Sequence, residues 1–252
     1  LRGNEVEENT TRQMLKAPQE SYTKSLWAVR SFQRKQKSPA KAKATPVISV
    51  QNVTAAYGKN DPVVRNVSFD IHSGRTVAVV GESGSGKSTV ARCITGLLPP
   101  LSGIIRFDGV DLPADYRSRS RDQLQQIQMI YQMADTALNP RKKIGEIIGR
   151  PVEFYLGLTG QAKRRRVEEL LAQIELEPSE FIDRYPSEVS GGQKQRIGIA
   201  RALAAEPKFV ICDEVTSALD QLVAEGILRL LTDLQDKMHL SFMLITHDLS
   251  TV

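Results

Sequence analysis

A glycine-rich loop between an apolar run and a helical segment is the feature that most constrains this chain. Residues 81–89 read GESGSGKST, which matches the pattern G-x-x-x-x-G-K-[ST]. The apolar run 76–80 precedes the loop, and residues 90–94 continue it as a helix. Glycines let successive backbone N–H groups point inward, and the positive end of the helix adds to their attraction for phosphate. The segment therefore predicts a phosphate-binding loop in which Lys87 reaches the β- and γ-phosphates and Ser88 ligates Mg²⁺.

A second helix start with exposed backbone N–H groups follows about a hundred residues later. Residues 189–196 read VSGGQKQR and precede the helical run 197–203. Ser190 is a candidate N-cap, and the two glycines after it leave N–H groups open at the positive end of the helix. Taken alone, Ser-Gly-Gly-Gln is as compatible with a flexible turn as with an anion site, so its interpretation depends on the other segments.

Acidic residues and a histidine stand at the ends of two predicted buried strands. The run 209–212 leads into Asp213 and Glu214, and the run 242–245 leads into Thr246 and His247. In a parallel sheet, ligands gather at the carboxyl ends of the strands, so these side chains should converge on the phosphates. Singly, each is typical of a solvated strand end or a capping residue. Their order along one chain favours a single site.

In order and spacing, these segments resemble an ATP-binding cassette (ABC) ATPase. The glycine loop resembles Walker A, residues 190–194 the family signature, residues 209–214 Walker B, and residues 217–220 the D-loop. The resemblance implies ATP and Mg²⁺ as cofactors. The residues it assigns to the nucleotide are Tyr57, Gly81, Glu82, Ser83, Gly84, Ser85, Gly86, Lys87, Ser88, Thr89, Ser190, Gly191, Gly192, Gln193 and Asp220.

The resemblance also implies catalytic and metal roles. Asp213 would hold Mg²⁺ through water, with Ser88 and Gln132 as further metal contacts. Glu214 would be the general base for the attacking water. The catalytic set that it implies is Glu214, His247, Gln132 and Lys87.

Three further details belong to this resemblance. Tyr57 matches the aromatic residue that stacks on adenine, and His247 the residue that contacts the γ-phosphate. Val189 and Val215 stand where the family usually has leucine and proline. Neither change removes a chemical group, so we expect activity.

The implied partners come from the same family. The signature of one cassette completes the site of another, so a second cassette is expected, as a covalent tandem or a dimer. Residues 138–141, 144–148 and 184–186 resemble the oligopeptide, dipeptide and nickel importer branch. This implies an ATPase that powers peptide import on the cytoplasmic face of the inner membrane, as a peripheral subunit of integral permease subunits and, indirectly, of a solute-binding protein. The alternatives are import of nickel or another small solute, a soluble ABC-type ATPase in a non-transport assembly, and a degenerate module that holds ATP without hydrolysing it.

Charge and composition divide the chain into an arm and a cassette. Residues 1–46 hold ten Lys or Arg and four Glu, although the net charge of all 252 residues is only +5, so the cassette is nearly neutral. This distribution argues against nucleic acid as a partner. We expect residues 1–34 to be the C-terminal tail of a preceding cassette, 35–46 a basic Pro/Ala/Lys linker, and 47–252 an ABC ATPase domain that is C-terminally incomplete. The alternative is a private N-terminal extension on a chain that ends naturally.

The expected fold class is α/β, a P-loop NTPase with a mostly parallel core sheet. Residues 47–53 and 67–71 alternate as edge strands of a small antiparallel β subdomain. Helical periodicity predicts a helical signature subdomain at about 138–190, in which the basic run 163–166 forms a solvated face. The two cysteines, Cys93 and Cys212, are interpreted as packing residues.

Overall fold

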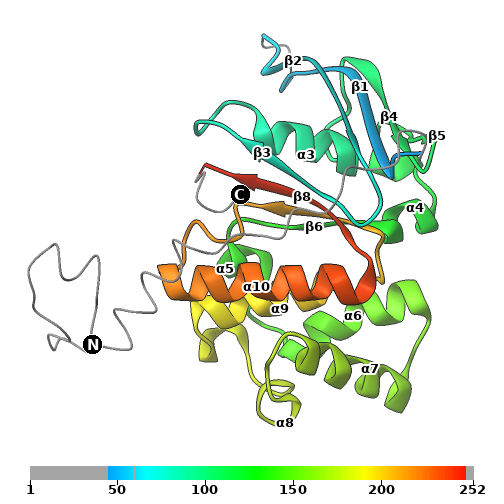
Figure 1. Cartoon of the computed structure of the whole chain (residues 1–252). Coiled ribbons are helices and arrows are strands. Elements are labelled where there is room, and N and C mark those ends of the chain that lie inside the picture. Colours follow the sequence, from blue (N-terminus) through cyan, green and yellow to red (C-terminus); the bar gives the residue numbers. More distant parts are fainter. Residues whose placement is uncertain (1–44, 59–60, 248–252) are drawn as a thin grey trace, which may run out of the picture.

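The computed structural model describes residues 45–58 and 61–247. These residues form two four-stranded sheets, with one helix beside both sheets and a group of helices on the far side of the second (Figure 1). The expected tail at 1–34 and nearly all of the expected linker at 35–46 lie outside the described residues. The α/β fold class with one parallel and one antiparallel sheet is as predicted.

The first sheet is antiparallel and has the strand order β2-β1-β4-β5. Its strands are β1 (Ile48–Ala55), β2 (Val64–Ile71), β4 (Ser102–Phe107) and β5 (Val110–Asp111). The expectation that 47–53 is an edge strand was wrong, because β1 pairs with both β2 and β4. Alternation of apolar residues reports which face of a strand is buried and carries no information on how many neighbours the strand has.

The second sheet is parallel and has the order β3-β8-β7-β6. Its strands are β3 (Thr76–Val80), β6 (Ile127–Ile130), β7 (Phe209–Asp213) and β8 (Ser241–Thr246). Val80 lies opposite Thr246, and Asp213 lies opposite Ile245, so the carboxyl ends of these strands are level. The residues that follow each strand therefore meet at one edge of the sheet.

The two faces of the parallel sheet belong to different cores, as the two-residue period of a strand requires. Phe209 and Ile211 of β7 pack into the core shared with the antiparallel sheet. Val210 and Cys212 point the other way, into the core formed with the helices. All four are fully buried, so β7 reads as a continuous hydrophobic run.

Helix α3 (Lys87–Thr95) is the layer between the sheets (Figure 1). Val90 and Ile94 are buried in the same core as Ile48 of β1 and Phe209 of β7. The helix follows β3 directly through the glycine loop, so its first turn faces the carboxyl edge of the parallel sheet. It ends at Gly96, which has a φ of 76°.

The remaining helices cover the opposite face of the parallel sheet (Figure 1). They include α6 (Ile144–Leu156), α7 (Gly160–Gln173), α8 (Pro178–Phe181), α9 (Gly191–Leu203) and α10 (Gln221–Met238). Helices α4 (Arg121–Gln126) and α5 (Ala134–Ala137) flank β6. Two 3₁₀ turns span Tyr116–Ser118 (η1) and Pro186–Glu188 (η2). The basic run on α7 is largely paired with carboxylates: Lys163 with Glu153, Arg164 with Glu168, and Arg166 with Glu169 and Glu206.

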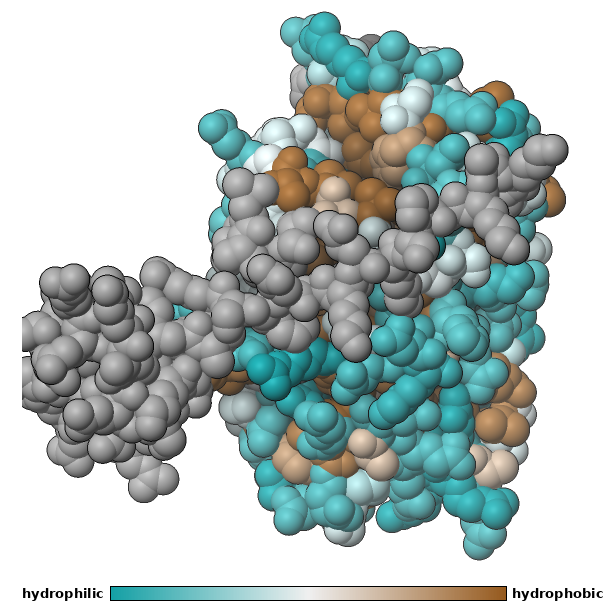
Figure 2. Space-filling model, viewed as in Figure 1, coloured by the Kyte–Doolittle hydropathy of each residue, from teal (hydrophilic) through white to brown (hydrophobic). Residues whose placement is uncertain are grey.

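The surface differs between the sheets and the helices. On the face shown in Figure 2, hydrophobic residues gather in the upper half, where Figure 1 places β3. The lower half, over the helices, is mainly hydrophilic. Strand β3 is only partly buried along its length, in contrast to β7 and β8. Both cysteines are buried, and burial raises the pKa of the Cys93 thiol to about 11, which fits a packing role.

Candidate nucleotide-binding site

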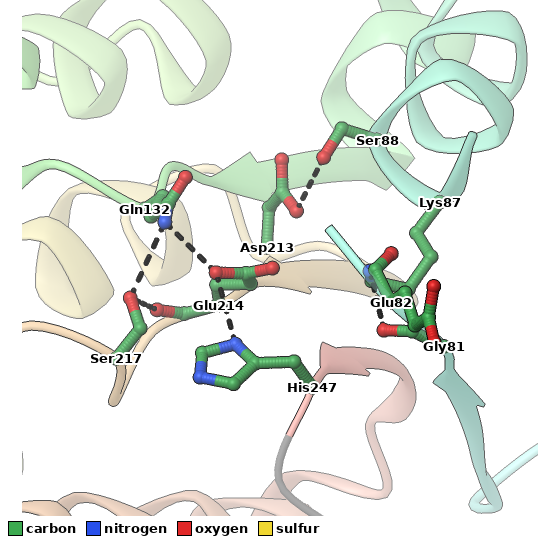
Figure 3. Close-up of polar contacts among 9 residues, drawn as sticks. All are labelled: Gly81, Glu82, Lys87, Ser88, Gln132, Asp213, Glu214, Ser217 and His247. Carbon is green, nitrogen blue, oxygen red and sulfur yellow. Dashed lines mark hydrogen bonds and ion pairs between the residues drawn. The ribbon is translucent and has the colours of Figure 1, made fainter. Parts of the chain in front are cut away.

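The glycine loop is bent for phosphate binding and held from within by its lysine. Gly84 and Gly86 have φ of 82° and 97°, a region that favours glycine. A Cβ on Gly86 would also come within 2.9 Å of Val64 Cγ2. The Nζ of Lys87 donates to the carbonyl oxygens of Gly81 and Glu82, each at 2.8 Å (Figure 3). Helix α3 starts without a side-chain cap, so its first N–H groups can bind an anion.

Ser88 and Asp213 form the part of the site that suits a cation. The Ser88 hydroxyl donates to Asp213 Oδ1 at 3.0 Å, although the residues are 125 positions apart. Burial raises the pKa of the Asp213 carboxyl, and the neighbouring charge of Glu214 adds to this, while the Ser88 hydrogen bond and the charges of Arg92 and Lys87 act against it. A cation beside Asp213 would stabilise its ionised form.

The donor set is compatible with Mg²⁺. In the described part of the chain, no group of three or more His, Cys, Asp or Glu side chains could enclose a metal ion. Mg²⁺ is commonly held by one or two protein oxygens together with phosphate and water. The hydroxyl of Ser88 and the carboxylate of Asp213 supply that number.

Glu214 lies beside the cation position and is held by backbone and side-chain contacts. Its φ is 47°, an uncommon value for a residue other than glycine, and its N–H donates to the carbonyl of Ile245 at 3.0 Å. Its Oε2 accepts a hydrogen bond from Gln132 Nε2 at 2.8 Å and lies 3.4 Å from His247 Nδ1 (Figure 3). The side chain of Glu214 is 14% exposed and that of His247 is 53% exposed. The ends of β7 and β8 thus converge, as the sequence predicted, and Gln132 brings the end of β6 to the same place.

Tyr57 lies against the first turns of α3. Its hydroxyl is 3.3 Å from Thr89 Oγ1 and accepts from Arg92 Nη1 at 3.1 Å. The Arg92 guanidinium also lies 5.8 Å from the ring centroid. The residue is 38% exposed, which leaves ring surface that a planar base can stack on.

The predicted signature residues form the start of α9. Ser190 is the N-cap, because its hydroxyl accepts from Gln193 N at 3.3 Å while Gln193 Oε1 accepts from Ser190 N at 2.9 Å. Among the described residues, no hydrogen bond or ion pair joins 190–193 to 81–89. Asp220 is likewise an N-cap, accepting from Val223 N at 3.0 Å at the start of α10.

Comparison with known proteins agrees with this geometry. Residues 64–217, more than half of the chain, match the sequence model of the ABC transporter family. The chain belongs to the ABC transporter family. A relative of this cassette in Sinorhizobium fredii, named as a peptide ABC transporter ATP-binding protein, is 44% identical over 199 residues that cover 78% of the chain and 56% of the relative.

Two further comparisons widen the range of relatives. A nickel import ATP-binding protein of Brucella suis is 41% identical over 214 residues, covering 82% of the cassette chain and 80% of that protein. A solved dimeric ATP-binding cassette, in a post-hydrolysis state with ADP and Pi, has a TM-score of 0.70 and 31% identity, covering 81% of this chain and 89% of that one. The chain spans just over half the length of the Sinorhizobium relative. No helix in the described residues of the cassette is both long and apolar enough to cross a membrane.

Sequence reasoning missed two contacts of the cassette. Ser217 Oγ lies 3.4 Å from Gln132 Nε2, so the predicted D-loop contacts the same amide that contacts Glu214. The other is the close approach of α9 and α10 at Gly192, where an added Cβ would lie 2.5 Å from Val223 Cγ1. Neither pair is close in sequence, so no local pattern in the sequence signalled either contact.

We expect Gly192→Ala to destabilise the cassette, because its methyl group would overlap Val223. Overpacking of this kind costs about 1–3 kcal/mol, and each kcal/mol lowers the Tm of a chain this size by about 2–4 °C. The measurement is thermal unfolding of Gly192→Ala, of Val223→Ala and of the double variant, in which the loss should be smaller. Gly191→Ala is the matched control, since its Cβ would meet only Leu219 Cδ2 at 3.9 Å. Equal Tm values for the two glycine variants would contradict the argument.

Proposed function

We propose that this chain is the ATP-binding and hydrolysing part of an ABC importer, and that the solute is a peptide. The observation that carries the proposal is the convergence of Gln132, Glu214 and His247 beside the Ser88–Asp213 pair. A carboxylate that is poised next to a cation position and a phosphate loop can activate water for attack on a phosphate.

Each residue of the site has a role that follows from its position. Lys87 and the N–H groups at the start of α3 bind the phosphates. Ser88 and Asp213 would hold Mg²⁺, which would neutralise phosphate charge. Glu214 orients a water and accepts its proton, while Gln132 holds the Glu214 carboxylate from one side and His247 from the other. Tyr57 stacks on adenine. These roles act mainly through positioning and electrostatics, which dominate phosphoryl transfer.

We propose that the active unit is a pair of cassettes. Ser190–Gln193 make no hydrogen bond or ion pair with the described loop of their own chain, yet the start of α9 presents backbone N–H groups suited to an anion. A second cassette would place its ATP there, either as a dimer or as part of one longer polypeptide. The dimeric cassette to which this chain is similar supports this arrangement.

We further propose that the pair sits peripherally on the cytoplasmic side of the inner membrane, bound to permease subunits that receive solute from a binding protein. Tyr131 and Met133 flank Gln132 and are 42% and 58% exposed, and Phe154 of α6 is 56% exposed. We propose that these exposed side chains contact the permease subunits. The names of the relatives support peptides as the solute, and the Brucella suis relative makes nickel the second candidate.

The test is ATP hydrolysis by the intact protein in lipid vesicles with its membrane subunits and binding protein. We expect a panel of short peptides to raise turnover. Stimulation by Ni²⁺ alone would favour the second candidate, and turnover that ignores membrane subunits and every solute would contradict the import proposal while leaving the ATPase proposal intact.

A further inference from the structure

Both ends of the short helix α5 form polar contacts with the signature helix α9. Near its start, Asp135 Oδ1 accepts from Lys194 Nζ at 2.5 Å. At its last residue, the carbonyl of Ala137 accepts from Arg201 Nη1. Lys194 and Arg201 are seven residues apart on α9, which is two helical turns, so both project from one face of that helix.

The two cationic side chains are largely enclosed by the protein. The Lys194 side chain is 19% exposed, against 67% for its partner Asp135. Burial lowers the pKa of the Arg201 guanidinium. Burying a cation without a partner costs free energy, so we expect these two side chains to keep their contacts with α5.

The same segment leads directly to the catalytic carboxylate of the proposed function. Gln132 lies two residues before α5, and its amide bonds Glu214 Oε2 at 2.8 Å. At the other side, Lys194 lies four residues after Ser190, and its N–H donates to the Ser190 carbonyl at 2.9 Å. One continuous set of contacts therefore runs from the start of α9, through Lys194 and Asp135, to Gln132 and Glu214.

We propose that Lys194 and Asp135 are positioning residues that couple the start of α9 to Gln132. A shift of the signature helix, when the partner cassette's nucleotide engages Ser190, then moves α5 and changes how the Gln132 amide holds Glu214. The proposal rests on the proposed ATPase function. The competing role for Lys194, direct contact with the partner's nucleotide, is disfavoured because its amine already pairs with Asp135.

The first measurement is amide hydrogen exchange in the intact protein without nucleotide. Asp135→Lys and Lys194→Asp should each speed exchange across residues 131–138 by about 3- to 5-fold, as expected for loss of one partly exposed ion pair. The double charge swap should return exchange to within about twofold of the original rate. Arg164→Glu on α7, which breaks the exposed Arg164–Glu168 pair, is the matched control and should leave residues 131–138 unchanged. Unchanged exchange in both single variants would overturn the proposal.

The second measurement separates positioning from direct binding. Each single variant should lower kcat for ATP by about 3- to 5-fold with the Kd for ATP unchanged, and the swap should restore kcat. A loss in Lys194→Asp that Asp135→Lys does not share, and that the swap does not repair, would overturn the proposal in favour of direct contact. Absence of hydrolysis by the unaltered protein would contradict the proposed function, whereas the exchange measurement would still decide the coupling.

Discussion

Replacing Glu214 by glutamine is expected to reduce ATP turnover by about 10²- to 10⁴-fold, the usual contribution of a general base, while ATP binding persists. Glutamine keeps the shape and length of the side chain and can still form hydrogen bonds, but it cannot accept a proton from water. The phosphate loop and the Ser88–Asp213 pair are untouched by the change. The measurement is steady-state hydrolysis by the intact protein together with equilibrium binding of ATP.

The chain offers a matched control for this substitution. Glu206 also has a positive φ, 53°, but its carboxylate pairs with Arg166 on the helical side of the molecule. Glu206→Gln should therefore retain turnover, which separates loss of the carboxylate at the site from any effect of glutamine in this backbone conformation. Turnover of Glu214→Gln within threefold of the original would show that another group is the base.

Replacing Lys87 by methionine is expected to weaken ATP binding by about 10- to 100-fold, because a hydrogen bond to a charged group contributes about 1.5–3 kcal/mol. The change removes the charge that faces the phosphates and also the two hydrogen bonds to Gly81 and Glu82. Equilibrium binding of ATP, with thermal unfolding to confirm the fold, is the measurement.

The control for Lys87 is a lysine of ordinary exposure. Lys208 pairs with Asp108 and its side chain is 61% exposed, so Lys208→Met should leave the Kd for ATP unchanged. Lys87 is only 7% exposed. Equal Kd values for the two variants would mean that the phosphates are bound by the loop backbone alone.

Local patterns in the sequence predicted the parts of the fold that depend on neighbours in sequence. The run 209–212 is a buried strand because four successive apolar residues serve two cores. Ser190 caps α9 because a serine three residues before a glutamine can form a reciprocal capping box. The expectation that Asp213, Glu214 and His247 meet followed from the parallel sheet, since strand ends at one edge are neighbours.

Contacts between distant segments were beyond the sequence. Nothing local distinguishes Ser217 as a neighbour of Gln132, or Asp135 as the partner of Lys194, since each pair depends on how helices pack over the sheet. The same limit produced the error at β1, where the pattern of one strand could not reveal its second neighbour. The roles of the individual site residues remain predictions until the substitutions above are made.

The placement of α3 between two sheets limits how this molecule can change over evolution. A helix that is buried on both sides has few positions that accept a new side chain, and Val90, Ala91, Cys93 and Ile94 are all buried. The face of α7, in contrast, can exchange one charged residue for another at small cost. Substitutions that change partner or solute specificity should therefore accumulate in the helical layer. The phosphate loop should change little, because the buried helix α3 that follows it tolerates few substitutions.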